Sequence, residues 1–143
     1  MPDILGSVLV DAGPLIAAAV KRDRYHRSAV EWFRDHPQVA LITTLPALTE
    51  ACHALIPVAQ SKLLRSIHAG TLRLCPIDEA DAARAAELIE RYRELPMDFA
   101  DASIIIASEK LGIADVLSVD HDDFDVYRST KGRPFHNWFP RLS

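Results

Sequence analysis

The sequence has few of the features that mark secreted or membrane proteins. Only two cysteines occur in 143 residues, Cys52 and Cys75, which excludes a disulfide scaffold and predicts two buried free thiols in a reducing compartment. The amino terminus lacks a basic start followed by a long apolar run, so no secretory signal is expected. No stretch is apolar over the length that a bilayer requires. We therefore expect a cytoplasmic protein with no membrane partner.

An excess of positive charge is also absent. Sixteen Lys and Arg residues stand against 20 Asp and Glu residues, a formal net charge of −4. This balance argues against a protein that coats nucleic acid non-specifically, but an enzyme with a local basic rim is compatible with it. What remains is an ordinary globular composition, 49% hydrophobic and 25% charged, which predicts one domain over residues 1–143.

Strand-like and helix-like segments alternate along the chain. Short β-branched or apolar runs predict strands at residues 7–10, 39–42, 71–75, 116–119 and 134–139. Helical periodicity and cap residues predict helices at 15–20, from Asp23 to before Pro37, at 46–56, from Ser61 to Gly70, at 79–93 and at 98–112. This alternation predicts an α/β fold, a parallel sheet with helices on both faces.

Two of the predicted strands end in an aspartate. Asp11 follows Ser7-Val8-Leu9-Val10, and Asp120 follows Val116-Leu117-Ser118-Val119. Because the carboxyl ends of parallel strands share one edge, where ligands bind, the two carboxylates are expected to be neighbours. The alternative for either residue alone is a turn or a helix cap.

Asp101 lies in a segment that is apolar on nearly every side, so its helix is expected to be buried. A carboxylate in that place needs a cation, and no Lys or Arg lies within one turn of it. A metal ion is one answer; a capping box with Asp98 as N-cap is the other. We favour the cap for Asp98 and the metal for Asp101.

Glu50 lies one turn inside the helix that follows the second strand, so it can reach the same edge. An exposed glutamate is the alternative. Four carboxylates without basic partners, Asp11, Glu50, Asp101 and Asp120, make a hard-oxygen site that suits Mg²⁺ or Mn²⁺. Two such ions can activate water and stabilise the leaving oxygen in phosphodiester cleavage.

These residues also carry a family likeness. The chain resembles the PIN-domain ribonucleases, in particular the VapC toxins of toxin–antitoxin pairs. The matching segments are Val10-Asp11-Ala12-Gly13-Pro14-Leu15-Ile16-Ala17, Thr49-Glu50-Ala51, Asp98-Phe99-Ala100-Asp101-Ala102-Ser103, Leu117-Ser118-Val119-Asp120-His121-Asp122-Asp123-Phe124 and Gly132-Arg133-Pro134-Phe135. Each is weak alone, but they follow one another in the family's order and spacing.

The resemblance implies a parallel sheet of about five strands between helices, with Asp11, Glu50, Asp101 and Asp120 as the acidic cluster around Mg²⁺ or Mn²⁺. It implies supporting roles for residues around the metal ligands, namely Asp98, Ser118 and Asp123. The family usually has Thr or Ser after its first Asp, where this chain has Ala12. That departure puts one supporting hydrogen bond in doubt and leaves the acidic cluster intact.

The function implied is a metal-dependent endoribonuclease that hydrolyses tRNA or rRNA, leaves a 5′-phosphate, forms a homodimer and is inhibited by a small VapB-like antitoxin. Two basic clusters could grip RNA phosphates or simply be solvated: Lys21, Arg22, Arg24 and Arg27, and Arg128, Lys131 and Arg133. The alternatives are a degenerate domain that binds RNA or protein, and a phosphatase with Asp11 as nucleophile. The phosphatase class usually has a second Asp where this chain has Gly13.

Overall fold

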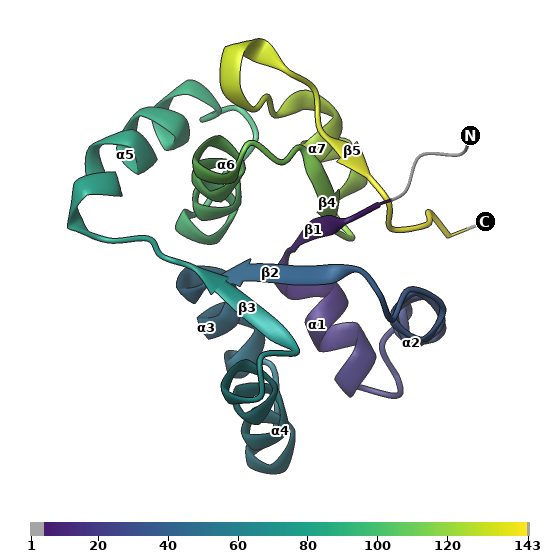
Figure 1. Cartoon of the computed structure of the whole chain (residues 1–143). Helices are drawn as coiled ribbons and strands as arrows, with labels where there is room; N and C mark the ends of the chain where they lie inside the picture. Colours follow the sequence, from purple (N-terminus) through teal and green to yellow (C-terminus); the bar gives the residue numbers. More distant parts are fainter. Residues whose placement is uncertain (1–4, 143) are drawn as a thin grey trace.

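A five-stranded parallel sheet forms the centre of the molecule (Figure 1). The computed structural model describes residues 5–142. The strands have the order β3-β2-β1-β4-β5 and are β1 (Ser7–Val10), β2 (Ala40–Thr44), β3 (Leu72–Cys75), β4 (Asp115–Leu117) and β5 (His136–Asn137). β1 is central, with Leu9 opposite Ile42 of β2 and Val116 of β4. The predicted α/β class and five-stranded parallel sheet are confirmed.

Helices cover both faces of this sheet (Figure 1). On one face, where Val8 and Val10 point, lie α1 (Ala12–Ala19), α2 (His26–Asp35) and α4 (Pro57–His68). On the other face, where Leu9 points, lie α5 (Ala82–Arg91), α6 (Phe99–Leu111) and α7 (His121–Val126). α3 (Leu45–His53) contributes Ala47 to one core and Ala51 to the other. The alternation of side chains along β1 thus divides the core into two layers.

The α6 helix is the most buried helix of the fold. Its side chains from Ala102 to Ser108 are all buried, which agrees with the prediction of a helix that is apolar on nearly every side. Asp98 caps its first turn, and Gly112, with φ of 67°, ends it in the left-handed conformation. Both predicted ends of this helix are confirmed.

Other helix starts were predicted wrongly. Asp23 does not cap α2; its side chain accepts the N–H of Tyr25 in a turn, and the helix begins at His26. Ser61 lies inside α4, which begins at Pro57 because proline fits the first turn of a helix. The predicted helix at 79–93 is split into a 3₁₀ turn (Glu79–Asp81) and α5. The pattern did not reveal α7, a helix of six residues.

Both cysteines are free thiols, as predicted, although Cys52 is only partly buried while Cys75 is buried. Within residues 5–142 no helix combines the length and the apolar character needed to cross a bilayer. Asp11 and Asp120 follow strands, Asp98, Asp101 and Asp123 lie at helix starts, and Glu50 lies within α3, so the sheet topology decides where these acids meet.

Candidate metal centre

Asp11 joins the central strand to the first helix. Its N–H donates to the carbonyl of Leu117 at 3.0 Å, so the hydrogen bonds between β1 and β4 continue to this residue. One carboxylate oxygen accepts the N–H of Ala12 at 2.9 Å and caps α1. A Cβ on Gly13 would lie 2.5 Å from Cγ2 of Val119, so only glycine lets α1 approach this closely. The side chain of Asp11 is consequently buried, with 2% of its surface exposed.

Ser118 connects Asp11 to the segment after β4. Its hydroxyl donates to the second carboxylate oxygen of Asp11 at 3.0 Å and accepts the N–H of Asp120 at 3.0 Å. The amide of Asn137 in β5 holds Ser118 in turn: its Oδ1 accepts the Ser118 N–H at 3.2 Å, and its Nδ2 donates to the Ser118 carbonyl at 2.9 Å. Sequence reasoning missed Asn137, because a single asparagine in an extended segment carries no pattern.

Asp98 and Asp101 form a capping box at the start of α6. The Asp98 carboxylate accepts the N–H of Asp101 at 2.9 Å, and the Asp101 carboxylate accepts the N–H of Asp98 at 3.3 Å. The two roles considered for Asp101 are therefore compatible. One of its oxygens is occupied by the cap, and the side chain also belongs to the acidic cluster.

Three carboxylates converge at the carboxyl edge of the sheet. Asp11, Asp101 and Asp120 each offer one oxygen, and these oxygens all lie within 4.8 Å of one another. Asp11 is buried, Asp101 is partly buried and Asp120 is exposed. Glu50 does not belong to this tight group; it is exposed on α3, close enough for its charge to raise the pKa of Asp11. The cluster is thus closed to solvent at Asp11 and open to solvent at Asp120.

The electrostatics of the cluster are unfavourable to four negative charges. Burial raises the pKa of Asp11 to about 7, and the charges of Asp120 and Glu50 contribute further. Burial and the charges of Asp11 and Asp98 raise the pKa of Asp101. The pKa of Glu50 and that of Asp120 are raised too, first by burial and then by neighbouring acids, Asp98 for both and Asp123 for Asp120.

No ion pair with Lys or Arg offsets this charge in the part of the chain described; the nearby His121 lowers the pKa of Asp120, but less than burial and the neighbouring acids raise it. None of the ion pairs among residues 5–142 includes Asp11, Glu50, Asp101 or Asp120. Clustered carboxylates with raised pKa and no Lys or Arg partner are the donor set of a hard divalent cation. The residues present therefore fit Mg²⁺ or Mn²⁺.

The first basic cluster is dispersed in the fold. Lys21 and Arg22 line an apolar groove between α1, α2 and α4. The guanidinium of Arg24 lies over the ring of Tyr25, 5.2 Å from its centroid, and Arg27 pairs with Glu31 at 3.5 Å. None of these contacts involves the acidic cluster, and phosphate binding by the four cations stays a prediction.

The second basic cluster lies around the turn between α7 and β5. Arg128 donates to the backbone carbonyls of Asp125, Val126 and Tyr127, so its guanidinium stabilises the end of α7. Lys131 has a positive φ of 59° in the turn, and Arg133 is exposed. RNA contacts by Arg128, Lys131 and Arg133 likewise remain a prediction.

Comparison with known proteins agrees with this architecture. The sequence model of the family described as PIN domain matches residues 8–129, a span that contains every acid of the cluster. The chain belongs to the PIN-domain family. The structure is similar to a solved structure of Mycobacterium tuberculosis VapC20, described as a sarcin-ricin loop cleaving toxin. The TM-score is 0.72 with 20% identity over 80% of this chain and 91% of VapC20. A search of curated proteins found no match.

Proposed function

We propose that this PIN domain is an endoribonuclease that depends on Mg²⁺ or Mn²⁺. One observation carries the proposal: three carboxylates from three different elements bring oxygens within 4.8 Å of one another, and no described cation neutralises them. The PIN-domain family and the fold shared with VapC20, described as a sarcin-ricin loop cleaving toxin, support RNA as the substrate.

The metal would be held by Asp11, Asp101 and Asp120, with Glu50 at the open side. When bound, a hard divalent cation lowers the pKa of water and offsets charge on the phosphate. The protein contributes position: hydrogen bonds to neutral donors fix the carboxylates of Asp11 and Asp101. Glu50, whose pKa is raised and which is exposed, accepts the proton of the attacking water at a carboxylate oxygen.

The reaction balances as a hydrolysis. The water oxygen forms a bond to phosphorus in line with the bond that breaks, between phosphorus and the 3′ oxygen. The 3′ oxygen takes a proton, and the product carries a 5′-phosphate. The ribose 2′-OH forms no bond in this scheme, so the step requires no base placed beside it.

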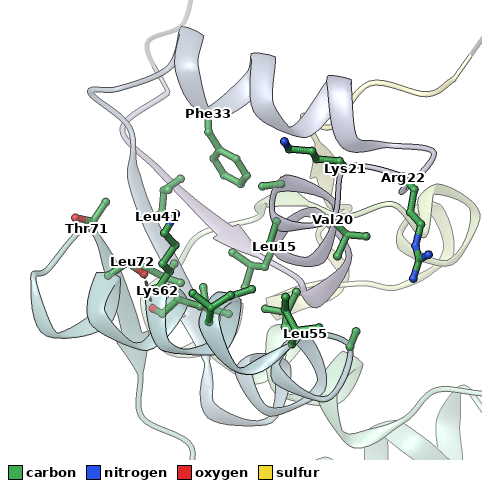
Figure 2. A pocket seen from close by; sticks show the side chains of 18 residues that line it. Leu15, Val20, Lys21, Arg22, Phe33, Leu41, Leu55, Lys62, Thr71 and Leu72 are labelled. Atoms are coloured by element: carbon green, nitrogen blue, oxygen red, sulfur yellow. Dashed lines mark hydrogen bonds between the residues drawn. The ribbon is translucent and has the colours of Figure 1, made fainter.

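We further propose that the protein is the toxin of a toxin–antitoxin pair, acting on tRNA or rRNA and inhibited by a small VapB-like antitoxin. A groove of about 900 Å³ (Figure 2) offers a place for this partner on the α1, α2 and α4 face. Its apolar lining includes Leu15, Phe33, Leu41, Leu55 and Leu72, with Lys21, Arg22 and Lys62 beside them. No described acidic residue lines it. This lining suits an amphipathic segment that carries acidic residues. Lys62→Glu should weaken binding to the product of the neighbouring reading frame.

The exposed apolar side chains of α4 suggest a homodimer interface. The α4 helix has no buried residue, and its side chains Val58 and Leu64 are 63% and 49% exposed. A helix that presents branched apolar side chains to solvent is typical of a surface that a partner covers. Light scattering of the purified chain measures its mass and tests this directly.

Cleavage of labelled total RNA with Mg²⁺ or with EDTA tests the proposed reaction. The wild type should cleave only with the metal, and Asp101→Asn should reduce the rate by at least about 100-fold. Asp122→Asn is the matched control, because Asp122 is exposed and pairs with Arg141 outside the cluster. Metal-dependent cleavage that survives in Asp101→Asn would overturn the site. Absence of both cleavage and metal binding by calorimetry would favour a degenerate binding domain.

The structure argues against the phosphatase alternative. That chemistry places a second acid two residues after the nucleophile, where this chain has Gly13. A side chain at position 13 would collide with Val119, since even a Cβ would approach it to 2.5 Å. The position therefore cannot hold a general acid without a shift of the segment after β4.

A further inference from the structure

Beside the acidic cluster lies a second hollow, of about 570 Å³, that the proposed reaction does not yet use. Glu50 and Asp98 line it. Because Asp98 accepts the N–H of Asp101 and the charge of Glu50 acts on Asp11, the hollow adjoins the acidic cluster. Its other walls come from α3, the start of α6 and Ile77. A strand of RNA that places a phosphate at the acids must lay a neighbouring nucleotide on this or another adjoining surface.

The hollow carries two exposed apolar side chains. Phe99 is the first residue of α6 and is 48% exposed, although seven consecutive residues of the same helix, Ala102 to Ser108, are buried. Leu45 is the first residue of α3 and is 57% exposed. Neither belongs to the two buried clusters of the core or packs against them. Exposed apolar groups gathered at one hollow are typical of a surface that binds a ligand.

Two polar side chains of α3, Thr49 and His53, also line the hollow. Leu45, Thr49 and His53 are spaced four residues apart and form one stripe along α3 that lines the hollow. The Thr49 hydroxyl donates to the Leu45 carbonyl at 2.8 Å, which leaves its lone pairs free to accept. The imidazole of His53 is exposed. A flat apolar face next to hydrogen-bonding groups matches a nucleobase, which has a π face and a polar edge.

A protein partner suits this surface less well. Glu50 and Asp98 would be covered together with Phe99, and burial of two carboxylates without a cation is unfavourable. The same carboxylates would repel the phosphates of an RNA strand, so the uncharged base, not the backbone, is the part of a nucleotide that suits the hollow.

We infer that Phe99 is a substrate-positioning residue: its ring stacks on an unpaired base next to the phosphate that is cut, with Leu45 beside it and the Thr49 and His53 stripe facing the base edge. This inference rests on the proposed ribonuclease function. Stacking on Phe99 needs an unpaired base, so a base in a duplex would have to leave its stack before it could reach the ring.

Steady-state cleavage of labelled RNA by Phe99 variants tests the inference. Phe99→Ala should raise KM by about 5- to 150-fold, the value of one base stack, with a smaller change in kcat. Phe99→Trp should keep KM near that of the wild type, and Phe99→Leu, which retains apolar area without a π face, should resemble Phe99→Ala. Leu111→Ala is the matched control, because Leu111 is 43% exposed at the other end of α6; its KM should not change.

A second measurement does not depend on cleavage. The emission of Phe99→Trp, recorded with Ca²⁺ and a single-stranded hexaadenylate RNA, should be quenched on binding as the new indole stacks on adenine. The wild type, which contains Trp32 and Trp138, gives the background to be subtracted. Equal KM for Phe99→Leu and wild type, or no quenching on bound RNA, overturns the inference while the ribonuclease stands. Loss of a dimer in Phe99→Ala by light scattering would assign the surface to a second copy instead. A wild type that neither cleaves nor binds RNA would refute both the ribonuclease function and the role of Phe99.

Discussion

Asp11→Asn should make the metal-free protein more stable at neutral and alkaline pH. Asp11 is buried and its pKa is raised to about 7, mainly by burial. A carboxyl whose pKa is higher in the folded than in the unfolded chain binds more protons when folded. Its contribution to the free energy of unfolding therefore falls as the pH rises from the unfolded pKa to the folded pKa. Asparagine keeps the shape of the side chain and removes this dependence.

The size of the effect follows from the two pKa values. With 3.8 for the unfolded chain and about 7 for the folded one, raising the pH from about 5.5 to about 8 lowers the free energy of unfolding by about 2 kcal/mol through Asp11 alone. The raised pKa values of Asp101, Glu50 and Asp120 act in the same direction. The wild type should therefore lose more than this amount over the interval, and Asp11→Asn should lose about 2 kcal/mol less.

Urea unfolding in EDTA at the two pH values measures this difference. Saturating Mg²⁺ should raise the free energy of unfolding of the wild type, and more at the higher pH because the ligands must be deprotonated. Asp11→Asn should lose most of this gain. Asp122→Asn, the control for an exposed carboxylate, should change neither quantity. An equally steep pH dependence in wild type and Asp11→Asn would refute the reasoning, since the charge of Asp11 would then carry no penalty.

Three further changes test other parts of the site. Glu50→Gln should lower kcat/KM about 100-fold at unchanged thermal stability if Glu50 accepts the proton of water; an unchanged rate would remove that role. Gly13→Ala should destabilise the fold by roughly 1–3 kcal/mol in chemical denaturation, and Val119→Ala added to it should restore most of the loss, unless the contact between them is relieved in another way. Asn137→Ala removes both hydrogen bonds to the backbone of Ser118, so it should lower the free energy of unfolding by roughly 1–3 kcal/mol and weaken Mg²⁺ binding measured by calorimetry. Unchanged Mg²⁺ affinity would show that these two hydrogen bonds are not needed for the site.

The sequence predicted those parts of the fold that depend on local pattern. Runs such as Ser7–Val10 are buried strands because they are short, apolar and bounded by turn-forming residues, and the α6 helix is central because almost no polar side chain interrupts it. The meeting of Asp11 with Asp120 also follows from pattern, since two parallel strands that each end in an acid place both at one edge.

Features set by contacts distant in sequence could not be predicted. Asn137 holds Ser118 across 19 residues, and nothing in either neighbourhood indicates the pairing. The aspartates of α7 favour a turn, but Phe124 is buried in the core on the Leu9 face of the sheet, and this packing stabilises the short helix. The apolar sequence of α6 gives no sign that Phe99 is exposed, and only the packing of the helix shows that its ring lies outside the core.

The way the acids are anchored explains why their repulsion persists in the folded chain. Neutral groups hold each of the three acids. The N–H of Ala12 and the hydroxyl of Ser118 donate to the carboxylate of Asp11, and the N–H of Asp98 donates to that of Asp101. The Ser118 hydroxyl oxygen accepts the backbone N–H of Asp120. A lysine or arginine in their place would stabilise the fold, but its charged group would occupy the space between the carboxylates. Neutral donors fix the oxygens and leave the charge to a cation. The three acids lie directly after β1, in α6 and between β4 and α7, so the site forms only when these elements are assembled, and metal affinity becomes a measure of the assembled fold.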